Sequence, residues 1–190
     1  MPKFKNVLVV ASHPDDEVLG CGGTLYKLKK KGVKISGLFL SDGESSRKHP
    51  KINKLILERK KQAIKAGKVL GIKNICFGNF PDNSMDTVPI LKIIQFIEKQ
   101  IKIVKPDTIF THFESDLNVD HQITSKAVIT ACRPIKNQTV KSILFFEVLS
   151  SSEWNISIKN KSFKPNYFVD ISKSIKFKLK ALKYYKREMR

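Results

Sequence analysis

The sequence has only three cysteines among 190 residues, and Cys21, Cys76 and Cys132 lie far apart without forming a Cys-x-x-Cys pair. A disulfide framework or an all-thiolate zinc site is therefore not expected, and this use of cysteine fits a reducing cytoplasm best. Long hydrophobic runs are also missing, since the longest, such as residues 7–11, fall far short of the ~18 residues that span a bilayer. We therefore expect neither a transmembrane segment nor a secretory signal peptide.

Glycine and proline are scarce as well, with 9 and 8 residues, and 28% of the residues are charged. This composition excludes collagen-like, low-complexity and disordered chains. The hydrophobic share of 41% is enough to fill one sizeable core at this length. We therefore predict a single domain over residues 1–190.

Negative charge is in short supply: 17 acidic residues face 36 basic ones, which gives a formal net charge of +19. Such an excess of positive charge could bind nucleic acid, an anionic membrane surface or an acidic substrate. However, only five of the basic residues are arginine, lysine is spread along the whole chain, and neither arginine nor interleaved aromatic residues are concentrated in it. Proteins that read bases or phosphates usually favour arginine. We expect salt-dependent, non-specific adhesion and no specific nucleic-acid partner.

Short apolar runs alternate with stretches of helical periodicity along the chain. Strands are predicted at residues 6–12, 33–41, 74–77, 108–111, 143–149 and 167–169. Helices are predicted from Leu19 into the basic turn that ends at Gly32, at residues 55–70, 90–104 and 123–132, and near the end of the chain. The last helix is predicted to bury Ile171, Ile175, Leu179 and Leu182.

Strands separated by helices of this length favour right-handed crossovers. The predicted fold class is therefore α/β, a three-layer αβα sandwich with a mainly parallel, Rossmann-like sheet. In such a sheet, ligands bind beyond the carboxyl ends of the strands. Residues that directly follow a strand are therefore the candidates for a functional site.

Polar clusters follow two of the predicted strands. The segment His13-Pro14-Asp15-Asp16-Glu17 follows the first strand, and His112 with the stretch 116–121 follows the fourth. Taken alone, the first cluster has a structural explanation, because proline and acidic residues suit the first turn of a helix. The second cluster favours a metal site over this structural explanation, because a histidine among carboxylates after a strand suits a divalent metal better than a packed core.

A hydrolytic zinc site needs three protein ligands and one open position for water. His13, Asp16 and His121 can provide these ligands, and Asp15 can then face the water as general base. Asp120 could orient a ligand histidine from behind. The sequence thus favours one Zn²⁺ per chain.

At these residues the sequence resembles the PIG-L/LmbE-like de-N-acetylases. The motifs that carry the resemblance cover nearly the whole chain: Ala11-Ser12-His13-Pro14-Asp15-Asp16-Glu17, Gly20-Cys21-Gly22-Gly23, Ser41-Asp42-Gly43-Glu44, Arg59, Leu70-Gly71, Phe80-Pro81-Asp82, Pro106-Asp107, Asp120-His121, Arg133-Pro134, Glu147 and Phe168-Val169-Asp170-Ile171. The resemblance implies Zn²⁺ on His13, Asp16 and His121, with Asp15 as the base. The implied reaction is hydrolysis of an N-acetyl group from a GlcNAc-type amino sugar, which gives acetate and a free amine.

The resemblance also implies that Arg59 and Asp82 contact the sugar, and we add His112 and Glu147 as further candidates for substrate binding. The sequence does not define whether the substrate is a free sugar, a nucleotide sugar, a glycolipid or a polymer. An alternative function is a sugar- or nucleotide-binding relative that keeps the fold and the metal without turnover.

Two departures from the family pattern bear on activity. Many members carry histidine three residues before the last metal histidine, where this chain has Asn118. Asparagine can donate a hydrogen bond to an oxyanion but cannot act as an acid near neutral pH, so Asp15 and His112 are the candidates for the acid. Members also usually continue past the final helix, whereas this chain stops at Arg190. Either an edge of the site is absent, or a neighbouring subunit of a homo-oligomer completes it.

Overall fold

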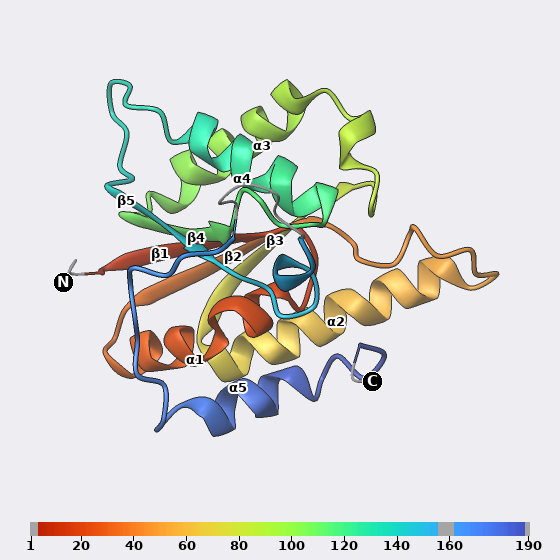
Figure 1. The fold of residues 1–190 in the computed structure, drawn as a ribbon, viewed down its shortest axis with the longest axis horizontal. Coiled ribbons are helices and arrows are strands. Elements are labelled where there is room, and N and C mark those ends of the chain that lie inside the picture. The colour runs from red at the N-terminus through yellow and green to blue at the C-terminus, as the bar shows by residue number, and fades with distance from the viewer. Residues whose placement is uncertain (1–3, 156–161, 189–190) are drawn as a thin grey trace.

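The computed structural model describes residues 4–155 and 162–188, and it folds as a parallel sheet between two layers of helices (Figure 1). The strands are β1 (Asn6–Ala11), β2 (Lys34–Ser41), β3 (Ile72–Phe80), β4 (Thr108–His112) and β5 (Ser142–Phe146). The helices are α1 (Asp16–Lys30), α2 (Ile52–Leu70), α3 (Ile90–Val104), α4 (Val119–Ala131) and α5 (Ile175–Leu182). Two short 3₁₀ turns, η1 (Met85–Thr87) and η2 (Ser152–Trp154), lie in the loops.

The sheet is parallel throughout, with the strand order β3-β2-β1-β4-β5. The chain winds outward from β1 to β3 and then crosses to the other side of β1 to form β4. In a doubly wound sheet of this kind, ligands bind at the carboxyl ends of the strands where the winding reverses. The predicted fold class is therefore confirmed, and the loops after β1 and β4 lie side by side.

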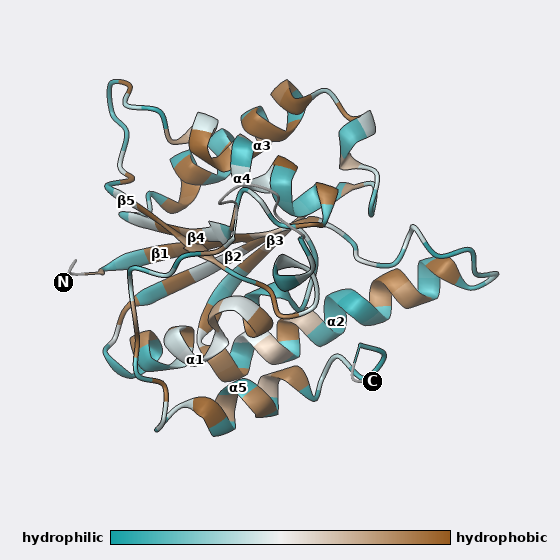
Figure 2. Cartoon of the chain, viewed as in Figure 1, coloured by the Kyte–Doolittle hydropathy of each residue, from teal (hydrophilic) through white to brown (hydrophobic). Residues whose placement is uncertain are grey.

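The core lies on both faces of the sheet because alternate residues of each strand point to opposite sides. In β1, Val7, Val9 and Ala11 pack toward α1, α2 and α5, whereas Leu8 and Val10 pack toward α3 and α4. The helices carry both hydrophobic and hydrophilic residues, as expected of surface helices that bury one side (Figure 2). Burial of both faces of β1 explains why its sequence reads as a continuous apolar run.

Two glycines of α1 bring this helix close to its neighbours. A Cβ atom at Gly20 would collide with the ring of Phe146, and one at Gly23 would lie 2.8 Å from Ile171. The glycine-rich segment after the first strand therefore serves close packing. This packing fixes the start of α1, which carries the polar residues that follow β1.

The strand predictions differ from the structure at three places. β3 extends over Ile72–Phe80 and is longer than residues 74–77, and β5 ends at Phe146 before residue 149. The strand predicted at residues 167–169 is wrong, and Phe168 there is 74% exposed. A short apolar run has the composition of a strand, but a strand also needs a paired neighbour, which composition cannot reveal.

The buried stripe predicted for the last helix is correct in part, since Ile171 and Leu182 are partly buried and Leu182 packs against the core. Ile175 and Leu179 are 40% and 51% exposed, and the chain instead buries Ser174, Ala181 and Tyr185. α5 packs against α1 and α2, so a small residue at position 181 permits close approach while the longer aliphatic side chains point outward. Hydrophobicity alone therefore does not identify the buried side of this helix.

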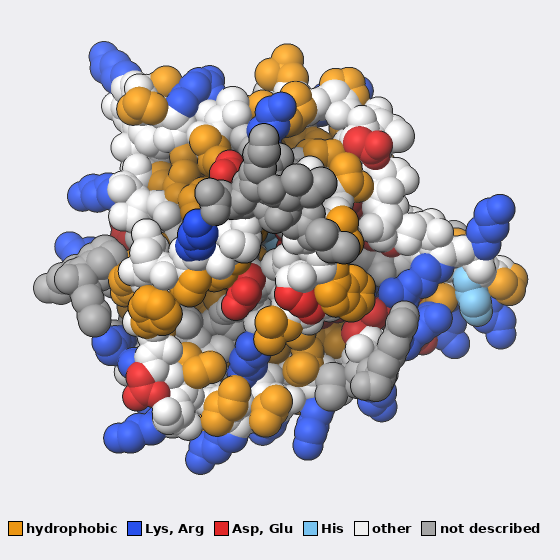
Figure 3. All heavy atoms as spheres, in the orientation of Figure 1, with side chains coloured by type: hydrophobic (Ala, Val, Ile, Leu, Met, Phe, Trp, Pro, Cys, Tyr) orange, Lys and Arg blue, Asp and Glu red, His pale blue; other side chains and the backbone are white. Residues whose placement is uncertain are grey.

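The basic side chains are dispersed over the surface. Lysine and arginine side chains project all around the outline of the molecule (Figure 3). The three cysteines are free, as predicted. Among the residues that the structure describes, no helix combines the length and apolar character needed to cross a membrane.

Candidate metal centre and catalytic pocket

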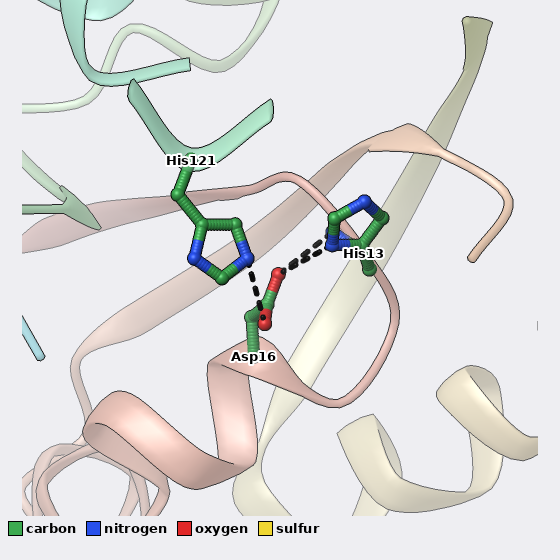
Figure 4. Close-up of side chains that lie close together, drawn as sticks. All are labelled: His13, Asp16 and His121. Carbon is green, nitrogen blue, oxygen red and sulfur yellow. Dashed lines mark hydrogen bonds and ion pairs between the residues drawn. The ribbon is translucent and has the colours of Figure 1, made fainter. Parts of the chain in front are cut away.

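Residues from the loop after β1 and from the start of α4 meet at the carboxyl edge of the sheet. His13 follows β1, Asp16 begins α1, and His121 lies in the first turn of α4 (Figure 4). They line a pocket of about 180 Å³. Its other lining residues are Asp15, Leu19, Gly43, Arg47, Arg59, Asp82, Asn83, Asn118, Ser150, Ser151 and Glu188. The reversal of winding between β1 and β4 thus brings the two polar clusters together.

His13, Asp16 and His121 offer ligand atoms that all lie within 4.8 Å of one another. The two oxygens of Asp16 divide between the histidines, with Oδ2 3.5 Å from His13 Nδ1 and Oδ1 3.4 Å from His121 Nε2. His121 Nε2 is buried and has no hydrogen-bond partner in the described part of the chain. A buried nitrogen that makes no hydrogen bond is costly, so this atom fits a metal ligand. The donor set of two imidazoles and one carboxylate is one that suits Zn²⁺.

Each of these histidines has a carboxylate on its other ring nitrogen. His13 Nε2 lies 3.0 Å from Asp120 Oδ2, and His121 Nδ1 lies 3.2 Å from Asp116 Oδ1. Such carboxylates fix the tautomer and the orientation of a metal-binding histidine. Asp120 also accepts backbone N–H bonds from Asn83 and Met85, at 2.8 and 3.0 Å. Its oxygens are thus engaged, which suits an orienting group better than a ligand.

The electrostatics of the cluster favour a cation. Burial alone would lower the pKa of His121, but Asp16 and Asp116 raise it to about 9. Burial would likewise raise the pKa of Asp116, yet its hydrogen bonds to His121 and Ser152 hold that pKa below its usual value. A field that retains a proton so strongly would also attract a divalent cation.

Asp15 lies beside the cluster in an unusual backbone conformation. Its φ angle is 123°, a region that residues with a side chain rarely adopt and that often marks a functional position. Its carboxylate is near Arg59, with Oδ2 3.5 Å from Nη2. Burial and the neighbouring Asp16 raise the pKa of Asp15 well above its usual value, while Arg59 opposes this effect. A carboxylate with a raised pKa can both accept and return a proton near neutral pH.

Three other residues that the sequence singles out reach the same pocket. Arg59 is 3% exposed, and its guanidinium pairs with Glu188 at 2.9 Å. Asp82 lies 3.2 Å from His13 Nε2. Asn118 precedes α4, and its Oδ1 accepts the N–H of Asp120 at 2.9 Å. Asn118 therefore caps the helix while its amide group lines the pocket.

The structure does not bring His112 to the lining of the pocket, where the sequence predicts it as a substrate contact or proton donor. It is fully buried and its Nε2 accepts the N–H of Ser12 at 2.9 Å. Burial lowers its pKa to about 4, and its ring stacks on that of His121 at 3.9 Å. His112 thus supports the floor of the site and cannot touch a substrate.

Glu147 also lies outside the pocket, so the structure does not bring it to the predicted substrate site. It follows β5, is exposed, and lines a separate hollow with Gly20, Phe146 and Phe168. Glu147 and the catalytic pocket thus belong to different surfaces.

Some residues of the site carry no assigned role in the sequence analysis. Asp116 could have been found, because it lies in the same polar loop as His121. Glu188 and the buried Tyr185 come from the turn after α5. No local pattern connects these two with a site built from the first and fourth strands.

The comparisons with known proteins point to one family. Residues 8–132 match the family described as PIG-L, GlcNAc-PI de-N-acetylase. The chain is 30% identical to the "uncharacterized deacetylase YaiS" of Escherichia coli over 97% of this chain and 92% of that protein. It is 29% identical to the diacetylchitobiose deacetylase of Thermococcus kodakarensis, over 97% of this chain and 70% of that protein.

Solved structures show the same fold. The N,N'-diacetylchitobiose deacetylase of Pyrococcus horikoshii superposes with a TM-score of 0.81 at 23% identity, covering 99% of this chain and 72% of that one. The conserved protein TT1542 of Thermus thermophilus superposes with a TM-score of 0.74 at 28% identity, covering 96% and 79%. Together, the family match and the near full-length relative place this chain in the PIG-L family of N-deacetylases.

Proposed function

We propose that this protein is a zinc-dependent hydrolase that removes the N-acetyl group from an N-acetylated amino sugar of the GlcNAc type. The observation that carries the proposal is the buried cluster of His13, Asp16 and His121 beside the strained Asp15, in which His121 Nε2 makes no hydrogen bond to the described residues and lies 3.4 Å from Asp16. The relatives named as deacetylases of diacetylchitobiose support the choice of an amino sugar.

Zinc held by His13, Asp16 and His121 would polarise the acetyl carbonyl and lower the pKa of water to about 7. Asp15 then takes a proton from the attacking water, and its raised pKa suits this role. After the proton transfer, Asp15 is the group that can return the proton to the departing amine. Asn118 cannot supply this proton, because an amide does not titrate near neutral pH.

Other residues of the pocket would bind and orient the sugar. Arg59, beside Asp15, and Asp82, beside His13, present a donor and an acceptor, which suits the hydroxyl groups of a sugar. Asn118 donates one amide hydrogen bond to Asn83 at 3.1 Å and has a second N–H to offer. This N–H could stabilise the oxyanion that forms on the acetyl group.

The proposal is tested by measuring acetate release from N-acetylglucosamine, N,N'-diacetylchitobiose and a GlcNAc glycoside with an anionic aglycone. The protein is stripped with a chelator and assayed with and without added Zn²⁺. We expect acetate release from at least one of these substrates, with loss of activity in the stripped protein and recovery on addition of zinc. A protein that binds zinc and sugar without releasing acetate would instead be a non-catalytic relative.

A further inference from the structure

A buried chain of contacts connects the end of the protein with the catalytic loop. Tyr185 lies in the turn after α5 and is completely buried. Its hydroxyl donates a hydrogen bond of 2.7 Å to Glu17 Oε1. The other oxygen of Glu17 accepts the backbone N–H of Asp15 at 2.9 Å. One carboxylate therefore joins a tyrosine from the C-terminal turn to the backbone of the proposed base.

Asp15 needs such support because of its backbone conformation. A non-glycine residue at a φ of 123° is strained by on the order of 1–3 kcal/mol, and it persists only where its surroundings hold it. The carbonyl of Asp15 accepts N–H bonds from Val18 and Leu19, which tie it to the start of α1. Its N–H depends on Glu17. Loss of the tyrosine hydroxyl would leave the Glu17 carboxylate with one side-chain bond fewer to hold its orientation.

The same tyrosine supports the second partner of Asp15. The guanidinium carbon of Arg59 lies 5.4 Å from the centre of the Tyr185 ring, within the range of a cation–π contact. Arg59 in turn lies 3.5 Å from the Asp15 carboxylate. Tyr185 itself does not line the pocket, so any effect on the reaction passes through Glu17 and Arg59.

We propose that Tyr185 is a positioning residue that holds Asp15 through Glu17. This proposal rests on the proposed role of Asp15 as the base. A tyrosine that merely filled the core would need a partner for its hydroxyl, but that partner would not have to be the carboxylate that anchors Asp15. The juxtaposition gives the C-terminal turn a function in catalysis although it lies far from the metal cluster in the sequence.

The kinetic test compares Tyr185→Phe with Tyr184→Phe. Tyr184 is partly buried, and its hydroxyl makes no hydrogen bond to the described residues, so the second variant is a matched control. We expect Tyr185→Phe to lower kcat about 10-fold with KM within about 2-fold of wild type, because a small displacement of a catalytic group costs rate. Zinc content should stay unchanged, and Tyr184→Phe should behave as wild type.

A double variant tests whether Tyr185 acts through Glu17. In assays above pH 7, where Glu17 is ionised, Glu17→Gln keeps only one acceptor oxygen for two donors, so it should lower kcat to a similar extent. In the Glu17→Gln background, Tyr185→Phe should cost less than a further ~2-fold, because residues of one network are not additive. Full additivity, or a wild-type kcat in Tyr185→Phe, would overturn the proposal. If Tyr185→Phe does not fold, Glu17→Gln carries the same comparison against Tyr184→Phe.

A second readout does not depend on activity. In zinc-loaded full-length protein, NMR hydrogen exchange at the Asp15 amide should be at least ~10-fold faster in Tyr185→Phe than in wild type and unchanged in Tyr184→Phe. If wild type releases no acetate, the proposed function fails while this measurement still decides whether Tyr185 positions Asp15. An Asp15 amide with wild-type protection in Tyr185→Phe would overturn the positioning role whatever the activity.

Discussion

Two adjacent carboxylates occupy different environments in this site. Both oxygens of Asp16 lie about 3.5 Å from histidine nitrogens, whereas Asp15 lies beside Arg59. We predict that Asp15→Asn retains zinc but slows acetate release by about 10²-fold or more, the usual effect of removing a positioned acid–base group. Asp16→Asn should lose zinc as well, because it removes a ligand. Elemental analysis and acetate assays on both variants check this; equal loss of zinc would mean that the two roles are assigned wrongly.

Glu17 should make stability depend on pH. Burial raises its pKa from 4.5 to about 7, although hydrogen bonds from Tyr185 and Asp15 oppose the shift. Below pH 4.5 the group is protonated in both states; between pH 4.5 and 7 only the folded state retains the proton. Its stabilising contribution is therefore lost as pH rises through this window, by at most roughly 3 kcal/mol.

The variant Glu17→Gln cannot titrate, so comparing its stability with that of wild type isolates the effect of Glu17. In metal-free protein, the free energy of unfolding of Glu17→Gln relative to wild type should increase as pH rises from about 4.5 to 7. Urea unfolding at several pH values measures this difference, and other titrating groups cancel in the comparison. A difference that does not change with pH would show that Glu17 is ionised in the folded protein over the whole range.

The meeting of His13, Asp16 and His121 could be predicted from the sequence because each follows a strand end or begins the next helix. The bond between Tyr185 and Glu17 could not, since it joins residues 168 positions apart and no local pattern relates them. The failure at His112 has a physical reason too. A histidine at the end of a buried strand can point into the floor of a site, and a sequence does not show which way it points.

At the scale of the element, α4 begins with a residue that serves both helix and pocket. Asn118 Oδ1 accepts N–H bonds from Asp120 and His121, the two residues of α4 that belong to the metal cluster and its support. We predict that Asn118→Ala lowers stability by about 1 kcal/mol, the usual cost of removing an N-cap, or about 2–4 °C in Tm. Asn118→Asp keeps the capping oxygen and should unfold near the wild-type temperature.

Activity separates the two roles of Asn118. If its amide also holds the oxyanion, Asn118→Ala should slow acetate release by about 10²–10³-fold, and Asn118→Asp should be slow despite its stability. Thermal unfolding and acetate assays on the same preparations make the comparison. A stable and fully active Asn118→Asp would show that residue 118 acts only as the cap.

The elements differ in how well local pattern defines them. α3 spans Ile90–Val104 as predicted, because its apolar residues recur at helical spacing over the whole length. α4 begins four residues before its predicted start at residue 123, since polar residues of the site occupy its first turn. The polar residues that the site needs therefore interrupt the hydrophobic pattern at this end of α4.

At the scale of the whole molecule, charge is distributed unevenly between surface and site. The chain carries a formal net charge of +19, yet buried acidic residues gather in and beside the pocket around two histidines. Among these carboxylates are Asp15, Asp16, Asp116 and Asp120. The surface excess predicts weak, salt-dependent adhesion to anions, whereas the site requires a cation to balance its own acids.

Removal of the metal should therefore destabilise the entire fold and not only abolish activity. A ligand that binds only the folded state adds about 2.7 kcal/mol at 100 times its Kd, so saturating zinc should raise Tm by about 5–10 °C over chelator-treated protein. His121→Ala removes a ligand and should abolish most of this increase, whereas Lys126→Ala, on the exposed side of the same helix, should keep it. Thermal unfolding of the three proteins, with and without added zinc and at equal ionic strength, measures the effect. Since His121 is one of the three residues proposed to hold the ion, an equal response to zinc in His121→Ala would mean that the ion binds elsewhere on the chain.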